Sequence, residues 1–319
     1  MENGTVLYIV VPCYNEEEVL PETAKRLKEK LNRLAEESKI APQSRVMFVN
    51  DGSKDRTWEL IEELHRSDPV FSGVDLSRNR GHQNALLAGL MTAKDRCDAV
   101  ISMDADLQDD INAVDTMLEK FLAGCDVVYG VRSSRKKDSF FKRFTAEAFY
   151  RLMNFMGAET VFNHADYRLM SRCALEGLEQ FKEVNLFLRG IVPMIGYTSA
   201  TVEYERGARF AGESKYPLKK MISFALEGIT SLSTRPIRYI SMLGFFIFLV
   251  SVLMLIYSVV RWAMGETIIG WASMICSVWA IGGLILLSLG VIGEYIGKIY
   301  LETKERPRFL IRQILDKCE

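Results

Sequence analysis

The sequence has no excess of charge of either sign, few histidines and no clustered cysteines. Its 40 lysines and arginines face 41 acidic residues, which argues against a nucleic-acid binder that relies on a strongly basic surface. The 6 cysteines are scattered, with no C-x-x-C pair and no histidine at zinc spacing, so we expect reduced thiols. No G-x-G-x-x-G follows the first predicted strand, which argues against a nicotinamide-binding protein. The first residues lack the basic region of a signal peptide, so none is expected.

Charge is also missing from two long hydrophobic runs toward the C-terminal end. The run 237–260 contains a single charge, Arg238, and the run 268–292 contains none. A helix needs about 20 apolar residues to cross the roughly 30 Å hydrocarbon core of a bilayer. Both runs are therefore predicted to be membrane spans, joined into an antiparallel hairpin by the short loop 261–267. A pair of buried helices in a soluble bundle is the alternative.

The cations around these runs predict the orientation of the hairpin. They gather before the first run and after the second, whereas the loop offers only Arg261, offset by Glu266. The positive-inside bias therefore predicts that the domain before the hairpin and the tail after it are cytoplasmic, at the inner (plasma) membrane. An apolar stripe within 219–234 predicts an amphipathic helix in the membrane interface, although a core-facing helix would have the same pattern. The predicted units are a soluble domain (1–217), an interfacial helix (218–235), a transmembrane hairpin (236–293) and a tail (294–319).

The soluble domain begins with apolar strand-like runs that alternate with helical stretches. Strands are predicted at 6–11, 45–49, 71–76 and 99–103, and helices at 17–37, 56–67 and 83–93. This alternation predicts an α/β fold around a parallel sheet with right-handed crossovers. Ligands bind beyond the carboxyl ends of the strands in such sheets, so the functional site is expected there.

These strand ends are unusually polar. Asp51 follows the second predicted strand, and Asp104, Asp106 and Gln108 follow the fourth. Carboxylates two residues apart could both approach one hard divalent ion if the strand end bends, and Mg²⁺ or Mn²⁺ prefers oxygen ligands completed by water and substrate phosphates. An Asp-x-Asp alone is usually only a polar loop, but its position after a buried strand strengthens the signal. We predict a metal site at Asp104 and Asp106, with Gln108 adjacent.

A series of short motifs carries a family resemblance. In order they are VVPCYNE (10–16), NDGS (50–53), RNRGHQ (78–83), DADLQD (104–109), YGVR (129–132), HADYRLM (164–170) and GESKY (212–216). With the two spans, they resemble the dolichol-phosphate-mannose-synthase-like branch of family-two glycosyltransferases, particularly bacterial polyprenyl-phosphate glycosyltransferases. No single motif is specific, but the ordered set covers essentially the whole chain. The resemblance implies a GT-A (Rossmann-like) catalytic domain and inverting sugar transfer.

The resemblance also implies where a nucleotide-sugar would bind. The implied donor-binding residues are Pro12, Tyr14, Glu16, Asp51, Asp104, Asp106 and Gln108. Among them, Asp51 would hold the base, and the last three would meet the metal and the diphosphate. Two positions depart from the family pattern, because Asn50 stands where Asp is frequent and Asp110 where Pro is frequent.

Cations are expected to position the phosphate of the acceptor, because arginine can fork onto phosphate oxygens. The candidates are Arg132, Arg206, Arg209 and Lys215. The motifs favour a functional role for Arg132 and Lys215, whereas Arg206 and Arg209 stay open between function and surface charge.

Asp166 is the most informative acidic residue outside the metal motif. It is predicted to lie near the reacting sugar, either orienting the acceptor or acting as a base, and a structural ion pair with His164 or Arg168 is the alternative. A phosphate whose second pKa lies near 6 is already ionised at neutral pH, which favours orientation over proton removal. We therefore predict Asp166, Arg132 and Lys215 as the catalytic residues, and His82 as a positioning or packed polar residue.

The sequence as a whole predicts a membrane-anchored glycosyltransferase that needs Mg²⁺ or Mn²⁺. The expected reaction moves a hexose or N-acetylhexosamine from a UDP-sugar to undecaprenyl (polyprenyl) phosphate. The alternatives are another donor such as GDP-mannose, a different acceptor such as a growing polysaccharide, or a catalytically silent membrane scaffold. No Q-x-x-R-W element of processive synthases is present, and the retained acidic motifs argue against a scaffold. The sequence leaves open whether the protein forms a homo-oligomer.

Overall fold

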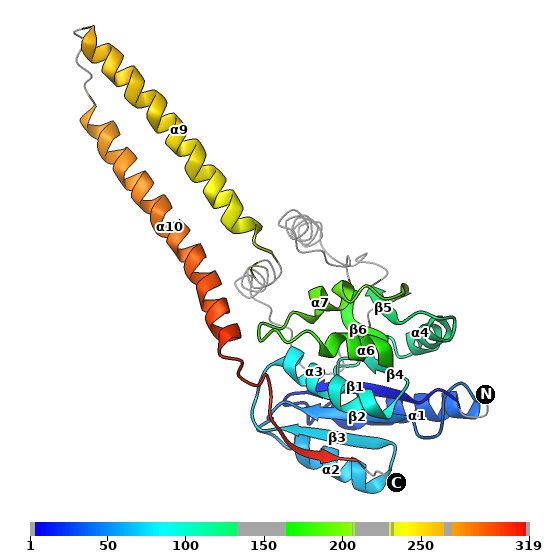
Figure 1. Ribbon diagram of the computed structural model, residues 1–319. Coiled ribbons are helices and arrows are strands. Elements are labelled where there is room, and N and C mark those ends of the chain that lie inside the picture. Colours follow the sequence, from blue (N-terminus) through cyan, green and yellow to red (C-terminus); the bar gives the residue numbers. More distant parts are fainter. Residues whose placement is uncertain are drawn as a thin grey trace.

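The structure is a computed structural model, and it describes residues 4–132, 164–205, 207, 230, 233–264 and 270–316. Arg206, Arg209 and Lys215, most of the predicted interfacial helix 218–235 and the loop 265–269 lie outside the described residues. Figure 1 follows the chain from an N-terminal sheet to two long helices that extend away from it, and then back to the sheet.

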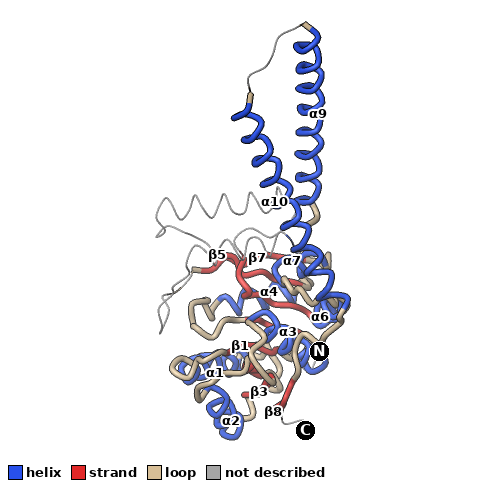
Figure 2. Tube along the Cα trace, turned by 90° about the vertical axis from the view of Figure 1, so that its left-hand side faces the viewer, coloured by secondary structure: helices blue, strands red, loops and turns tan. Residues whose placement is uncertain are grey.

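A mixed sheet forms the middle layer of the N-terminal region (Figures 1 and 2). Among the described residues it has 8 strands in the order β7-β5-β6-β4-β1-β2-β3-β8. The strands β1 to β4 are parallel, whereas β6 is antiparallel to both β4 and β5, and β8 is antiparallel to β3. Their bounds are β1 (Leu7–Cys13), β2 (Arg45–Asn50), β3 (Phe71–Leu76), β4 (Ala99–Ser102), β5 (Val127–Arg132), β6 (His164–Ser171), β7 (Ser199–Tyr204) and β8 (Ile311–Leu315).

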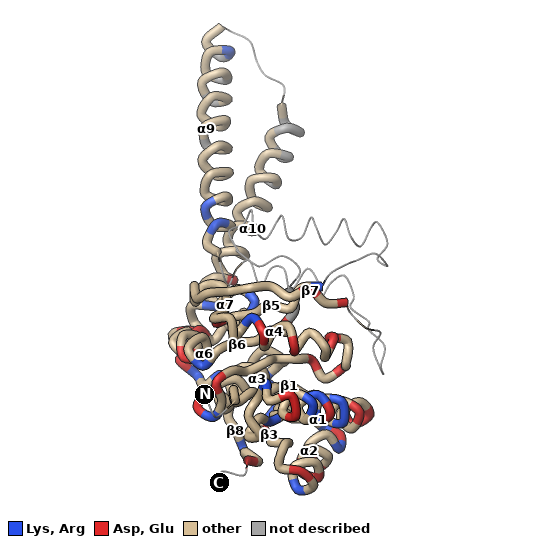
Figure 3. The backbone as a smooth tube through the Cα atoms, turned by 90° about the vertical axis from the view of Figure 1, so that its right-hand side faces the viewer, with Lys and Arg blue, Asp and Glu red and all other residues tan. Residues whose placement is uncertain are grey.

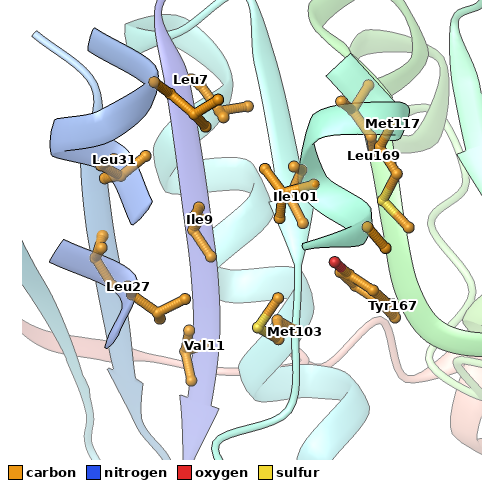
Figure 4. Packing of buried hydrophobic residues seen from close by; sticks show 14 of the residues in the cluster. Leu7, Ile9, Val11, Leu27, Leu31, Ile101, Met103, Met117, Tyr167 and Leu169 are labelled. Carbon is orange, nitrogen blue, oxygen red and sulfur yellow. The ribbon is translucent and has the colours of Figure 1, made fainter. Parts of the chain in front are cut away.

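Strand β1 lies between β4 and β2 because its side chains are apolar on both faces. Leu7 and Ile9 belong to the core on one face of the sheet, and Tyr8 and Val10 to the core on the other. Successive side chains of a strand point to opposite faces, so a strand covered on both sides needs a continuous apolar run. Figure 4 shows the first of these cores, where Leu27 packs beside the residues of β1.

Helices cover both faces of the sheet. The first face packs against α1 (Leu20–Glu36), α2 (Thr57–Ser67) and α4 (Ala113–Leu122), and the second against α3 (His82–Ala93), α6 (Arg172–Glu179) and α7 (Leu188–Met194). A short 3₁₀ turn, η1 (Lys94–Arg96), follows α3. In α1 the buried leucines recur at helical spacing, at Leu20, Leu27, Leu31 and Leu34, which gives this helix one apolar stripe facing the sheet.

Gly89 lets α3 pack directly on the sheet. A Cβ at this position would lie 2.4 Å from Val10 Cγ1 and 2.6 Å from Val49 Cγ2, and both valines are fully buried. We expect Gly89→Ala to lower the free energy of unfolding by about 1–3 kcal/mol, because an overpacked core must displace the helix or the strands. Thermal unfolding in detergent measures the change. Thr92→Ala on the same helix is the control, and equal shifts in both variants would contradict the packing argument.

Two long helices lie between β7 and β8 in the chain. α9 (Arg235–Ala263) and α10 (Trp271–Thr303) are the helices, among the residues the structure describes, that are long and apolar enough to cross a membrane. Their large apolar side chains are exposed, as in Leu253 (66%) and Leu286 (71%). Figure 3 shows charged residues throughout the globular region, whereas on α9 they occur only at the two ends. An apolar surface of this extent requires a partner other than water.

After α10 the chain returns to the sheet. Near the end of α10, the Glu302 carboxylate accepts hydrogen bonds from the backbone N–H groups of Val184 and Asn185, both at 2.8 Å. Arg308 then donates to the carbonyl of Phe181, and β8 adds to the sheet beside β3. Contacts between residues far apart in the sequence therefore tie the base of the hairpin to the sheet.

The predicted α/β fold is confirmed, with two differences. The sheet is mixed, because β6 enters antiparallel between β4 and β5, and β8 joins the opposite edge. The helix that contains most of the predicted span 268–292 runs from Trp271 to Thr303, and the predicted tail contains a strand of the sheet. The positions of β6 and β8 in the sheet depend on pairing with distant residues, which the local sequence pattern does not report.

Candidate active site

The candidate site lies where the direction of strand order reverses. From β1 the chain moves outward to β2 and β3, and then crosses back to place β4 on the other side of β1. In open α/β sheets, ligands bind beyond the carboxyl ends of the strands at such a switch point. Pro12 and Glu16 lie at the end of β1 and just after it, and Asp104 and Asp106 follow β4, so the fold brings these predicted donor residues to one edge of the sheet.

The loop after β1 is held by the loop after β2. Asn15 has a left-handed backbone (φ 54°), and its N–H donates to Ser53 Oγ at 3.0 Å. The N–H of Glu16 donates to Thr57 Oγ1 at 2.9 Å. The side chain of Tyr14 stays 43% exposed. The two loops therefore form one rigid rim that leaves Tyr14 accessible to a ligand.

Asp51 holds a third loop against this rim. Its two carboxylate oxygens accept hydrogen bonds from the backbone N–H of Arg80 (2.6 Å) and of Gly81 (2.9 Å), whose φ of 86° favours glycine. Burial raises the pKa of Asp51, and these two N–H groups act in the opposite direction. Asp51 thus shapes the 78–81 loop, and its contact with a nucleotide base stays a prediction.

The structure explains why asparagine stands at position 50. Asn50 Nδ2 donates to Asp75 Oδ1 at 2.7 Å, and both residues are buried. An aspartate here would bring two carboxylates together, which is unfavourable unless one of them is protonated. The departure from the family pattern is therefore matched to Asp75, near the end of β3.

Hydrogen bonds bend the chain after β4. On α1, Thr23 donates its hydroxyl to the carbonyl of Ala105 at 2.8 Å. Leu107 has a left-handed φ of 57°, and the N–H of Gln108 donates to Asp106 Oδ1 at 3.1 Å. The Asp104 side chain remains 37% exposed. The chain therefore bends at the Asp-x-Asp motif, and the approach of both carboxylates to one ion stays a prediction.

Carboxylates crowd around this bend. Burial raises the pKa of Asp104, and the nearby Asp166 and Asp106 raise it further, while His82 lowers it. Burial also raises the pKa of Asp109 to about 6, with Asp104 contributing in the same direction. The Oδ2 atom of Asp109 is buried and has no hydrogen-bond partner among the residues that the structure describes. A divalent cation would relieve this concentration of negative charge.

The donor set fits a hard divalent ion that is shared with a substrate. Within the described ranges, no group of three or more His, Cys, Asp or Glu side chains is arranged to hold a metal by itself. Mg²⁺ commonly takes one or two carboxylates from the protein and completes its shell with waters and substrate phosphates. Asp104 and Asp106, with the amide of Gln108 on the same loop, offer such an incomplete oxygen set.

Asp166 is paired with two arginines. Its Oδ1 lies 2.6 Å from Arg168 Nη2, and its Oδ2 lies 3.0 Å from Arg189 Nη2. His82 Nε2 lies between the acidic groups, 3.6 Å from Asp104 Oδ1 and 3.7 Å from Asp166 Oδ2. Burial alone would raise the pKa of Asp166, but Arg189 and Arg168 outweigh it and hold the pKa far below the usual range. A carboxylate held in this way is a weak base and a firm anchor for neighbouring cations.

Arg132 is linked to the loop that carries the metal motif. Its Nε donates to the hydroxyl of Tyr204 at 3.4 Å, and that hydroxyl donates to Asp109 Oδ1 at 2.6 Å. The N–H of Gly207 donates to the carbonyl of Gln108 at 2.8 Å. The end of β7 therefore braces the 104–109 loop and places Arg132 beside it. The other three predicted phosphate-binding cations lie in the part of the chain that the structure does not describe.

Comparison with known proteins gives the family. Residues 8–178 match the family model described as Glycosyl transferase family 2. The chain belongs to glycosyltransferase family 2. It is therefore an enzyme that transfers a glycosyl group.

Relatives match this family-two glycosyltransferase along nearly its whole length. The uncharacterized glycosyltransferase YkoT of Bacillus subtilis (strain 168) is 55% identical over 97% of this chain and 92% of its own. The bactoprenol glucosyl transferase of Shigella phage SfX is 43% identical over 95% of this chain and 98% of its own. Among solved structures, the mannosyltransferase PcManGT of Pyrobaculum calidifontis, in complex with GDP-Man and Mn²⁺, covers 94% of this chain and 86% of its own at 17% identity, with a TM-score of 0.46.

Some residues at the site of this glycosyltransferase were not predicted from the sequence. Asp109 belongs to the DADLQD motif, so a signal was present, but no role had been inferred for it. Arg189 and Tyr204 lie outside every motif, and only the packing of α7 and β7 against β6 and β5 brings them to the site. The ion pair between Asp166 and Arg168, one of the alternatives inferred from the sequence, is present.

Proposed function

We propose that this glycosyltransferase moves a hexose or N-acetylhexosamine from a UDP-sugar to a polyprenyl phosphate, such as undecaprenyl phosphate, with inversion at the anomeric carbon. The observation that carries the proposal is the attachment of the domain that holds the switch-point site to two exposed apolar helices, through Glu302 and β8. Such an attachment would hold the site at the membrane surface, where a lipid-borne acceptor resides. The bactoprenol glucosyl transferase relative, matched over 95% of this chain, supports the same acceptor class.

The proposed arrangement in the membrane follows from the charges that flank the hairpin. The GT-A catalytic domain (1–217), the interfacial helix (218–235) and the tail (294–319) would lie on the cytoplasmic side of the plasma membrane, and the hairpin (236–293) would span it. Arg235 and Arg238 begin α9 on the domain side. This is the distribution expected from the positive-inside bias.

The donor is proposed to bind along the rim formed by the loops after β1 and β2, together with the 78–81 loop. Pro12, Tyr14, Glu16 and Asp51 would surround the nucleotide, and Asp104, Asp106 and Gln108 would hold Mg²⁺ or Mn²⁺ at the diphosphate. When bound, the cation would neutralise the charge that grows on the departing nucleoside diphosphate. The buried, unpartnered Oδ2 of Asp109 adds negative potential that favours this cation.

The acceptor phosphate needs positioning more than activation. A monoester phosphate is largely ionised near neutral pH, so its oxygen can attack the anomeric carbon without a general base. One bond forms between that oxygen and the sugar, and the bond from the sugar to the nucleoside diphosphate breaks, with no proton transferred. Arg132 and, from the family resemblance, Arg206, Arg209 and Lys215 would offset the repulsion between the two anionic substrates. Asp166 would keep Arg189 and Arg168 in position.

The proposal is tested by incubating the purified full-length protein in detergent with undecaprenyl phosphate, Mg²⁺ or Mn²⁺ and a panel of labelled nucleotide-sugars. Label that enters the organic phase from a UDP-sugar, and that is lost when EDTA is added, is the expected result. Label from GDP-mannose alone would overturn the UDP assignment and keep the lipid acceptor. Nucleotide release or polymer without a lipid product would overturn the lipid acceptor, and an inactive protein that binds no nucleotide would overturn the proposed function.

A further inference from the structure

The C-terminal strand contains a bulge at one residue. β8 pairs with β3 so that Asp75 faces Gln313 and Leu76 faces Ile311, which leaves Arg312 without a partner in the register. A bulge inserts one extra residue into a strand and redirects its side chain, and bulges are frequent beside active sites. Here the extra residue lies beside the carboxyl end of β3, and the candidate site also lies at the carboxyl ends of the strands.

The side chain of Arg312 turns toward the buried end of β3. Its Nη1 lies 3.2 Å from Asp75 Oδ2, and its Nη2 donates to the carbonyl of Ser77 at 3.1 Å. The Asp75 side chain is only 2% exposed, whereas that of Arg312 is 62% exposed. A buried carboxylate requires a partner for each oxygen, and Arg312 supplies the second one.

Asp75 connects Arg312 with the rim of the donor site. Its other oxygen accepts from Asn50 Nδ2, and Asn50 Oδ1 accepts from the N–H of Ser53 at 3.1 Å. The hydroxyl of Ser53 in turn accepts from the N–H of Asn15 in the loop after β1. One ion pair and three hydrogen bonds therefore connect the C-terminal strand with both loops that would surround the nucleotide.

We propose that the C-terminal strand is part of the donor site, with Arg312 as a positioning residue for the nucleotide pocket. Arg312 fixes the carboxylate of Asp75, Asp75 fixes the amide of Asn50, and Asn50 fixes the turn at Ser53. The inference rests on the proposed function, because it takes a nucleoside diphosphate as the ligand of this rim. It adds a segment more than 200 residues beyond Gln108, the last of the proposed donor-binding residues, since β8 begins at Ile311.

The test compares Arg312 variants of the full-length protein by direct binding of UDP and of GDP in the presence of Mn²⁺, and by the transfer assay. We expect Arg312→Ala to weaken UDP binding and to raise the donor KM by about tenfold, within the range seen for residues coupled in one hydrogen-bond network. The kcat should stay within about twofold, because Arg312 is distant from the reacting atoms in this series of contacts. The UDP affinity and donor KM of Arg312→Lys should lie between those of the wild type and of Arg312→Ala, since an ammonium cannot reach Asp75 and Ser77 with a planar fork.

Two further variants separate positioning from general destabilisation. Asp75→Asn combined with Arg312→Ala should recover most of the UDP affinity, because an asparagine there can still accept from Asn50 and leaves no buried charge unpaired. Gln313→Ala, the neighbouring position in β8, should bind UDP like the wild type. Should Arg312→Ala fail to fold, Arg312→Lys and the double variant decide.

The outcomes distinguish this inference from the proposed function. A wild-type protein that binds neither UDP nor GDP overturns the proposed function. A wild-type protein that binds UDP while Arg312→Ala binds it equally well overturns only the role of Arg312. A loss in Arg312→Ala that appears in kcat with no change in donor KM, or that Asp75→Asn does not relieve, also overturns it.

Discussion

Asp106→Asn is expected to lower the rate of sugar transfer by about 10²–10³-fold, the cost of removing one preorganised stabilising group from a transition state. The substitution removes a charge but preserves the loop, because an asparagine oxygen can still accept the hydrogen bond that Gln108 N–H now donates to Asp106 Oδ1. The defect should therefore lie in the use of the cation. Initial rates measured across a Mn²⁺ titration should show a weaker apparent affinity for the metal together with a lower maximal rate.

The chain offers a matched control on the same loop. Asp110 Oδ1 accepts from the N–H of Asn112 at 2.9 Å, the same two-residue pattern as in Asp106, and Asp110 is not a predicted metal ligand. Asp110→Asn removes an equal charge and keeps an equivalent hydrogen bond. It should leave the rate and the Mn²⁺ dependence close to those of the wild type. Equal losses in the two variants would show that the loop carries no specific cation site.

Asp166→Asn is expected to destabilise the protein by about 3–5 kcal/mol, the usual cost of breaking a buried ion pair from one side. The Arg168 side chain is only 2% exposed, so the substitution leaves its charge without an ionised partner inside the domain. Arg189 loses its ion pair with Asp166 as well. Denaturant unfolding in detergent measures the loss, and transfer should fall steeply even under conditions where the variant remains folded.

Two comparisons test the origin of that loss. Arg189→Gln should destabilise less than Asp166→Asn, because Arg189 is 32% exposed and Arg168 remains paired with Asp166.

Because the folded pKa of Asp166 is depressed, the stability it contributes is present above its unfolded pKa of about 4 and is lost only as the pH falls below that value. The wild-type rate should therefore show no inflection from Asp166 between about pH 6 and 9. An acidic limb in that range that disappears in Asp166→Asn would instead identify Asp166 as a base.

The sequence predicted the parts of the molecule whose signals are local. The apolar run of β1 and the Asp-x-Asp after β4 are read from consecutive residues, and the structure has both at the switch point. The pairing of Asn50 with Asp75 could not be read in this way, because it depends on the register between β2 and β3. The same limit applies to Arg189, which reaches Asp166 only because α7 packs against β6.

The return of β8 was missed for a related reason. Its sequence, Ile311–Leu315, is short and mixes polar with apolar residues, so no strand pattern distinguishes it from a tail. What makes it a strand is the open edge of β3, which lies more than 200 residues earlier in the chain. A sheet edge can recruit any segment that reaches it with suitable geometry, and only tertiary structure shows which segment does so.

The position of β8 near the C-terminal end also sets the order in which the parts of the protein are synthesised and assembled. A ribosome makes the chain from its N-terminal end, so both helices of the hairpin are synthesised before the strand that completes the sheet. Until β8 arrives, β3 remains an unpaired edge, the kind of surface on which nascent chains associate wrongly. Synthesis of the two long helices and completion of the sheet are thus successive stages of one assembly, and the sheet becomes complete only after both helices have been made.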